Sequence, residues 1–148
     1  MLLDINLKER FWQGPNGTIY YYDSSRDKWL SAPREVVLFN INHRNLSTDR
    51  WMAIDKIPSN ISGYKVPRKG TITAITVQTK TNANSIFKIR KNNISTDLCS
   101  VSLFNKSGKI IDSLNVDVDE KDWLQSLMTV NSGNVNYPVV SLEISWRR

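Results

Sequence analysis

One short segment of the chain gathers four carboxylates, Asp117, Asp119, Glu120 and Asp122. Several carboxylate oxygens in one place could hold Ca²⁺. An EF-type loop also needs a glycine for its sharp turn and a distal Glu, whereas Lys121 sits inside this cluster. Two of the carboxylates could also be a glycosidase pair, but the sequence does not set their separation. We predict no metal here, and interpret the segment as a solvated strand face running into a hairpin turn.

Two other residue types could support catalysis, a histidine and a cysteine, and the chain has one of each. His43 lies in the segment INHRNLS without a catalytic motif around it, and Cys99 lies in the strand-like run LCSVSLF. An unpaired cysteine in such a run is usually a small buried hydrophobe. The six glycines are scattered singly, so no phosphate-binding glycine loop is present. We therefore expect no enzyme activity, no cofactor and no metal.

The charge balance raises the question of nucleic acid, because the net charge is +6 and the sequence pI is about 9.6. The basic side chains are spread along the chain, with local clusters at Lys65, Arg68 and Lys69, at Lys88, Arg90 and Lys91, and at Arg147 and Arg148. A nucleic-acid groove would combine such charges with exposed aromatics. The nearby Phe87 and Trp146 fall on faces that we assign to the core. We do not expect nucleic-acid binding, and attraction to an acidic protein surface fits equally well.

The elements that must position these residues are strands, because apolar and polar residues alternate along the chain. The last run shows it best: Val140, Leu142, Ile144 and Trp146 alternate with polar residues. Period-two alternation is typical of strands with one buried face. The chain of 148 residues has the size of one domain. We predict an all-β fold, a single antiparallel β-sandwich of about eight strands. The candidate strand segments are 18–22, 35–41, 51–54, 71–79, 87–90, 98–104, 110–118, 123–130 and 138–146.

Three consecutive tyrosines in the first predicted strand suggest a contact surface. Tyr20, Tyr21 and Tyr22 precede a polar turn and Trp29. Exposed aromatics flanked by Asn and Asp could stack on sugars. The alternative is that one or two of them pack as the amino-terminal edge of the sandwich, and we favour this alternative.

The amino end, MLLDINLKERFWQ, contains Asp4 and Glu9 and has no continuous apolar region, so it does not resemble a secretory signal. The longest apolar runs are far shorter than the roughly 20 residues needed to cross a bilayer. We expect no membrane association and folding in a cytoplasm.

Four segments in order resemble a known module: YYYDSSRDKWLSAPRE (20–35), SGYKVPRKGTITAITVQT (62–79), NVDVDEKDWLQ (115–125) and VNYPVVSLEISWR (135–147). They are similar to a small β-sandwich module of tailed-bacteriophage structural proteins. The resemblance covers residues 18–148. It implies a jelly-roll fold, frequently trimeric, that serves in head fibres, capsid decoration and tail appendages. It implies no catalytic residues.

Such modules commonly end a longer fibre chain, whereas here about 17 residues precede the module. We therefore expect a short N-terminal docking arm (1–17) followed by a jelly-roll-like domain (18–148). The expected protein is a capsid decoration or head-fibre subunit that forms a homotrimer, binds other virion proteins and joins the virion in the host cytoplasm. Its docking residues would be the apolar ones of the arm, Leu2, Leu3, Ile5, Leu7, Phe11 and Trp12. The alternative is a tail-associated receptor- or carbohydrate-binding module that uses Tyr20–Tyr22 or the loop Asn131–Asn136.

Overall fold

The structure is a computed structural model, and it describes residues 11–148. In this range the protein is all-β, as predicted, but it has twelve strands instead of about eight. None of the described residues forms a helix that is long and apolar enough to span a membrane. The strands are β1 (Phe11–Gln13), β2 (Ile19–Asp23), β3 (Lys28–Asn40), β4 (Arg50–Trp51), β5 (Ala53–Ile54), β6 (Ile57–Pro58), β7 (Tyr64–Lys65), β8 (Gly70–Lys91), β9 (Cys99–Ile111), β10 (Val116–Val118), β11 (Trp123–Ser132) and β12 (Val139–Arg147).

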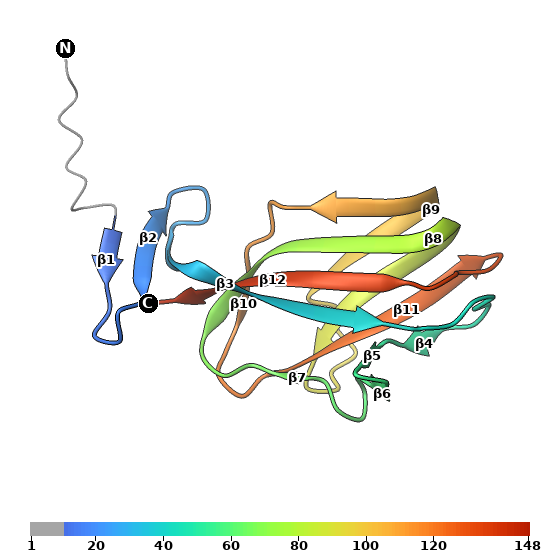
Figure 1. The fold of residues 1–148 in the computed structure, drawn as a ribbon, viewed down its shortest axis with the longest axis horizontal. Coiled ribbons are helices and arrows are strands. Elements are labelled where there is room, and N and C mark those ends of the chain that lie inside the picture. The colour runs from blue at the N-terminus through green and yellow to red at the C-terminus, as the bar shows by residue number, and fades with distance from the viewer. Residues whose placement is uncertain (1–10) are drawn as a thin grey trace, which may run out of the picture.

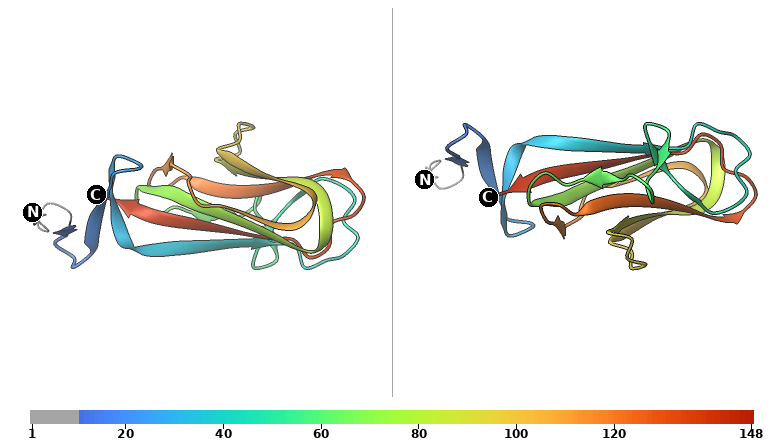
Figure 2. Two further views of the ribbon diagram at one scale, coloured as in Figure 1. Left: turned by 90° about the horizontal axis from the view of Figure 1, so that it is seen from above. Right: turned by 90° about the horizontal axis from the view of Figure 1, so that it is seen from below.

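All strands belong to one antiparallel sheet, which curls so that its two halves face each other (Figures 1 and 2). Its main path is β1-β2-β3-β12-β8-β11-β4, with β9 and β10 also paired to β8. The first half of β8 pairs with β12, from Gly70 to Gln78. Its second half pairs with β11, from Asn84 to Lys91. β8 is therefore the strand that joins the two halves.

The length of β8 corrects the sequence prediction of two separate strands, 71–79 and 87–90. Its partner β9 is likewise continuous across the gap between the predicted strands 98–104 and 110–118. The pairing of the two strands shifts register between Gln78 and Ala83, where the hairpin bends. At the bend the small side chain of Ala83 is buried, while the polar residues 80–82 are exposed. Polar residues here mark a bend in a continuous strand, which a local pattern cannot distinguish from a loop.

A bulge in β8 explains why its alternation looks imperfect. Ile72 and Ile75 are three positions apart, so a regular strand would place them on opposite faces. Both are fully buried. The register against β12 shifts between Ala74 and Ile72, which leaves Thr73 as the extra residue. An extra residue of this kind changes the side-chain alternation on its strand, so both isoleucines reach the core.

The acidic segment is not the hairpin turn that we predicted. β10 pairs with the first half of β8, whereas β11 pairs with its second half. The connection 119–122 therefore crosses between the two halves of the curled sheet. The predicted strand 110–118 is also divided, into the end of β9 and the separate β10. Long-range pairing with β8 decides both outcomes.

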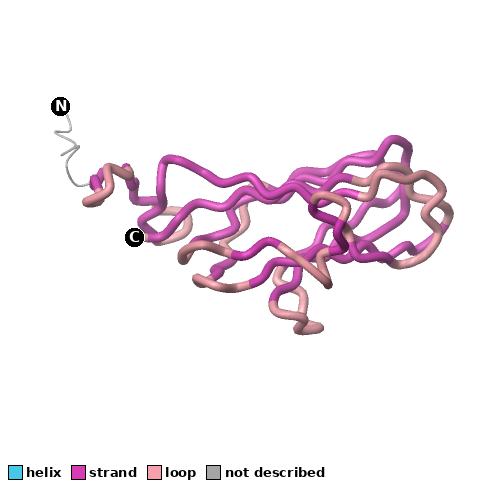
Figure 3. Tube along the Cα trace, turned by 60° about the horizontal axis from the view of Figure 1, so that its bottom comes forward, coloured by secondary structure: helices cyan, strands magenta, loops and turns pink. Residues whose placement is uncertain are grey.

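A single apolar core lies between the two halves of the sheet. The predicted inward row of β12, Val140, Leu142, Ile144 and Trp146, is buried, and so is Phe87. Ser145 departs from the expected polar face because it is buried too. Several irregular connections lie at the end of the molecule opposite the C-terminus in Figure 3. These connections form the candidate site.

Candidate binding groove

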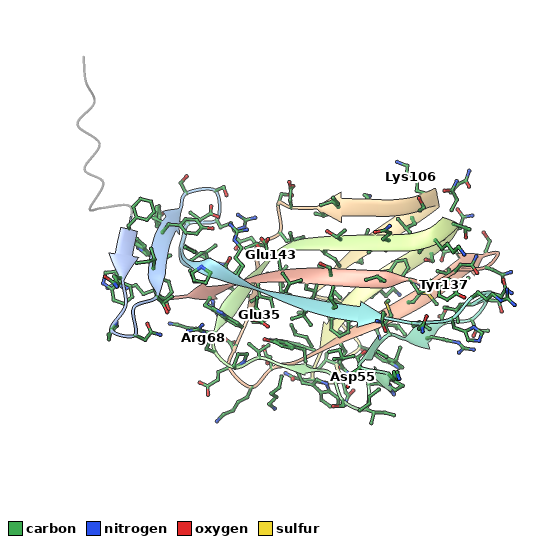
Figure 4. The ribbon with its side chains drawn as sticks, in the orientation of Figure 1. Glu35, Asp55, Arg68, Lys106, Tyr137 and Glu143 are labelled. Atoms are coloured by element: carbon green, nitrogen blue, oxygen red, sulfur yellow. The ribbon has the colours of Figure 1, made fainter. Side chains whose placement is uncertain are left out.

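The molecule is elongated, and its two ends differ in construction (Figure 1). The proximal end consists of β1, β2, the start of β3, β10 and the last residues, Arg147 and Arg148. The distal end consists of residues 40–61, 78–82 and 135–139, including Asp55 and Tyr137 in Figure 4.

At the proximal end, the carboxylates considered for a metal are bound by cations. Lys28 Nζ lies 2.6 Å from Asp117 Oδ1, and the guanidinium of Arg147 contacts both Asp117 and Asp119. Burial raises the pKa of Asp117, but hydrogen bonds from Lys28 and Thr71, together with the charge of Arg147, outweigh it and lower the pKa below its ordinary 3.8. These carboxylates act as partners of basic side chains.

Asp122 has a structural role in the connection that follows. It accepts hydrogen bonds from Lys91 Nζ at 2.8 Å, from Asn92 Nδ2 at 2.9 Å and from the backbone N–H of Asp119 at 2.9 Å. Burial opposes ionisation, yet these three donors lower its pKa below the ordinary 3.8. Among residues 11–148, no group of three or more His, Cys, Asp or Glu side chains could hold a metal ion.

Arg26 fixes the β2–β3 hairpin to the rest of the sheet. Its guanidinium donates to the carbonyl oxygens of Leu114 at 2.6 Å, Asp112 at 2.9 Å and Thr73 at 3.2 Å. It also pairs with Asp23 at 2.6 Å. Four polar partners around one cation make it a cross-link between segments far apart in the sequence.

The three predicted contact tyrosines do not share one surface. Tyr20 is buried and packs on Trp12 with ring centroids 5.3 Å apart. Tyr22 is exposed and packs on Trp29 at 5.6 Å. Tyr21 lies on the opposite face of β2, where its hydroxyl accepts a hydrogen bond from Arg34. The three tyrosines therefore lie on two faces of β2, and only Tyr20 is buried.

Only two of the six predicted docking residues belong to the part of the chain that the structure describes. Leu2, Leu3, Ile5 and Leu7 are outside the described residues. Phe11 and Trp12 are on β1, which pairs with β2, so this part of the predicted arm belongs to the sheet. Phe11 is 54% exposed. The guanidinium carbon of Arg148 lies 4.0 Å from the ring centroid of Trp12, which is a close cation–π contact.

The lone histidine and cysteine carry no catalytic geometry. His43 is exposed, and its Nδ1 lies 2.6 Å from the carbonyl oxygen of Arg44. Cys99 is half-buried against the core rather than fully buried as expected. Burial, and after it the charge of Asp97, raise the pKa of the Cys99 thiol to about 11. The thiol therefore stays protonated at neutral pH and is a weak nucleophile.

The distal end holds an open groove of about 700 Å³. This volume is within the roughly 300–1,000 Å³ typical of small-molecule sites. The lining combines aromatic and aliphatic side chains with amides and cations: Asn40, Ile41, Asn42, Arg50, Trp51, Ala53, Lys56, Pro58, Asn60 and Ile61. The sequence predicted a short strand at 51–54 but not the groove. The one local feature that could have indicated a binding surface there was Trp51, an aromatic residue within a polar connection.

The wall of the groove is fixed on β11. Between Trp51 and Ala53, Met52 is fully buried and its N–H donates to the carbonyl oxygen of Ser126 at 2.8 Å. Ser59 is also buried, and its Oγ accepts from the N–H of Ser126 at 3.0 Å. Between these anchors, Asp55 and Lys56 make the turn of the β5–β6 hairpin with positive φ angles of 47° and 70°. Such angles define a type I′ turn. The segment that carries Trp51 and Lys56 is therefore held in place by its hydrogen bonds to β11.

Gly63 closes this segment against β11. A Cβ at this position would lie 2.0 Å from Nε1 of Trp123 and 2.1 Å from the carbonyl oxygen of Leu124. Neither contact is possible for a real side chain, so the chain can approach β11 this closely only at a glycine.

The loop 131–136, another predicted contact, supports the groove from the other side. Val135 is buried and pairs with Leu46, while the Asn136 side chain accepts from the N–H of Asn45 at 2.7 Å. The next residue, Tyr137, has φ +48° and is 40% exposed. A positive φ is unusual for an aromatic residue, and it is held by the N–H of Tyr137 donating to the carbonyl oxygen of His43 at 2.9 Å.

Tyr137 extends the groove along the surface. A second hollow is bounded by Asn40, Ile41, Asn42 and Lys56, which also line the groove, and by Asp55 and Tyr137. A third hollow shares Tyr137 and Val139 with the second and reaches Lys80. The Lys80 ammonium lies 5.7 Å from the ring centroid of Tyr137. The shared lining residues connect the three hollows into one extended surface from Trp51 to Lys80, which we call the distal groove.

The distal groove is equipped for binding. Flat aromatic rings at Trp51 and Tyr137 can stack on the apolar face of a ligand. Amides can donate and accept hydrogen bonds to its polar groups. The cations of the three linings are Arg50, Lys56 and Lys80, and the carboxylate is Asp55. The surface therefore combines stacking, hydrogen bonding and net positive charge.

Comparison with known proteins does not assign the chain to a family. No family model matches the chain, and no curated protein matches it. One solved structure with similarity is the crystal structure of FLHE, with a TM-score of 0.40 and 11% sequence identity. That match covers 79% of this chain and 100% of the other.

Proposed function

We propose that the protein is a non-enzymatic structural protein of a tailed-bacteriophage virion, a capsid decoration or head-fibre subunit attached through its N-terminal end. The observation that carries the proposal is the polarity of the molecule. β1 and β2 lie at the proximal end, whereas β4, β5 and β6, whose residues line the distal groove, lie toward the opposite end (Figure 1). A subunit attached by its proximal end would present the groove outward. The resemblance of four segments to virion modules supports the same assignment.

The jelly-roll arrangement and a homotrimer belong to this proposal. A row on the outer face of the sheet, with an exposed apolar side chain at each end, offers a surface for association. Leu38, Ser141, Thr76 and Ile110 are aligned across β3, β12, β8 and β9. Leu38 is 56% and Ile110 67% exposed. A closed oligomer would bury such side chains between copies. Light scattering of the purified chain should give three times the mass of one chain, and a monomeric mass for Leu38→Asp/Ile110→Asp; a monomeric wild type would contradict the trimer.

Loading onto particles tests the virion assignment. Particles grown without this gene product are mixed with the purified chain, and occupancy is measured by mass spectrometry. We expect wild type to load and a variant with Leu2, Leu3, Ile5 and Leu7 changed to Ser to lose at least tenfold in occupancy. Trp51→Ala, at the opposite end, is the control and should load normally. Absence of the chain from wild-type particles would contradict the virion role, and unchanged loading of the Ser variant would contradict the docking arm.

The second candidate function is a tail-associated receptor- or carbohydrate-binding module, and the distal groove favours it. Its aromatic, amide and basic lining suits a polar ligand better than a packed protein interface. Immunogold labelling distinguishes the two candidates, because label on the head supports the first and label on the tail supports the second.

A further inference from the structure

We infer that the distal groove binds an acidic saccharide, a sugar chain carrying carboxylate groups, with Trp51 and Tyr137 as stacking platforms and Arg50 and Lys56 as charge partners. The inference rests on the receptor-binding function proposed above as the second candidate. It names a site that sequence analysis placed elsewhere, at Tyr20–Tyr22 and the loop 131–136.

The choice of an acidic ligand follows from charge. Arg50, Lys56 and Lys80 make no ion pair with any carboxylate of residues 11–148, whereas the basic residues beside β10 are paired. Arg50 and Lys56 are exposed and line the same groove. A guanidinium can form two parallel hydrogen bonds to a carboxylate. The groove is therefore complementary to an anion.

The choice of a saccharide follows from the remaining lining. Trp51 is half-buried, so its ring is held in place while part of it faces the groove. Arg90, itself paired with Asp97 at 2.7 Å, lies 6.0 Å from the Trp51 ring centroid and helps to fix the indole. Amide side chains at Asn40, Asn42 and Asn60 supply donors and acceptors for hydroxyl groups. Aromatic platforms with amides and cations match a sugar ring that bears hydroxyls and a carboxylate.

The length of the surface indicates a chain of several sugars. The three hollows share lining residues from Trp51 through Lys56 and Tyr137 to Lys80. Two aromatic residues and three cations along one path can contact successive units of a polymer. The Tyr137 side chain is 40% exposed, and its backbone is held by the hydrogen bond to His43.

Binding of purified full-length protein to oligogalacturonate, measured by calorimetry, tests the inference. The methyl-esterified oligomer is the matched ligand, because it keeps the sugar backbone and removes the charge. We expect the ester to bind at least tenfold more weakly. Arg50→Gln/Lys56→Gln should lose at least tenfold in affinity, and Trp51→Ala a similar factor. Lys106→Gln/Lys109→Gln, which removes the same charge from exposed sites on β9, should change affinity less than twofold.

Four outcomes would overturn the inference. They are no binding at millimolar oligogalacturonate, equal affinity for the ester, an equal loss in both double variants, and at least tenfold tighter binding of single-stranded DNA. Thermal unfolding of Trp51→Ala checks that the variant folds, and the double variants test the site even if it does not. None of these results depends on where the chain is located on a particle, so the virion proposal stands or falls separately.

Discussion

At the proximal end, Asp117 is contacted by both Lys28 and Arg147, and the Arg26 guanidinium is surrounded by four oxygen partners. At the distal end, Arg50, Lys56 and Lys80 have no carboxylate partner among residues 11–148, and they line open hollows. Charges that are paired with one another stabilise the fold and are not available to bind a ligand. Charges that are displayed without partners contribute little to stability and remain available for binding. We therefore expect substitutions at the proximal end to affect mainly stability, and substitutions at the distal end to affect mainly the proposed ligand binding.

The largest expected effect is on the wall of the distal groove. Gly63→Ala would place a Cβ against Trp123 and the Leu124 carbonyl, so the segment must move off β11. We expect a loss of about 3 kcal/mol or more in the free energy of unfolding, measured by urea denaturation. Hydrogen exchange should show lost protection at Met52 and Ser59 while β2 stays protected. Uniform loss across the molecule would show that the two ends are not independent.

A matched pair of arginine variants compares the ends directly. Arg26→Ala removes the guanidinium that donates to three carbonyl oxygens and to Asp23. We expect a cost of about 2–3 kcal/mol. Arg50→Ala removes an exposed side chain at the distal end and should stay within about 0.5 kcal/mol of wild type. Urea denaturation measures both, and equal costs would contradict the comparison.

Acid should weaken the proximal end before the distal end. Burial raises the pKa of Asp23, but hydrogen bonds from Ser25 and Arg26 outweigh it, so its pKa lies below 3.8, as does that of Asp117. A group with a lowered folded-state pKa stabilises the fold above the unfolded pKa and loses this contribution as pH falls through the folded value. Stability should therefore be constant above about pH 5 and fall below pH 4. Asp117→Asn should flatten the fall, and an unchanged acid transition would contradict the assigned role.

The smallest effect concerns the backbone at Tyr137. Its φ of +48° disfavours a side chain, and β-branched side chains most of all. Tyr137→Gly should change the free energy of unfolding by no more than about 1 kcal/mol, because released strain offsets lost contacts. Tyr137→Val should be less stable than Tyr137→Gly in thermal unfolding. The reverse order would show that the exposed ring, and not the backbone, dominates at this position.

The sequence alone determined the all-β class and the buried row of β12, because period-two alternation states directly which side chains face a core. Residues Asp55 and Lys56 lack the Asn-Gly type of sequence that signals a type I′ turn, so the β5–β6 hairpin was not predictable.

Only the tertiary structure decided how distant strands pair and what they bring together. The bulge at Thr73, the bend of β8 near Ala83 and the separation of β10 from β11 each depend on a partner strand far away in the sequence. The distal groove has the same origin, because Trp51, Lys80 and Tyr137 come from three segments that meet only after the sheet has curled. Local alternation specifies which face of a strand is buried, but not which strand lies beside it.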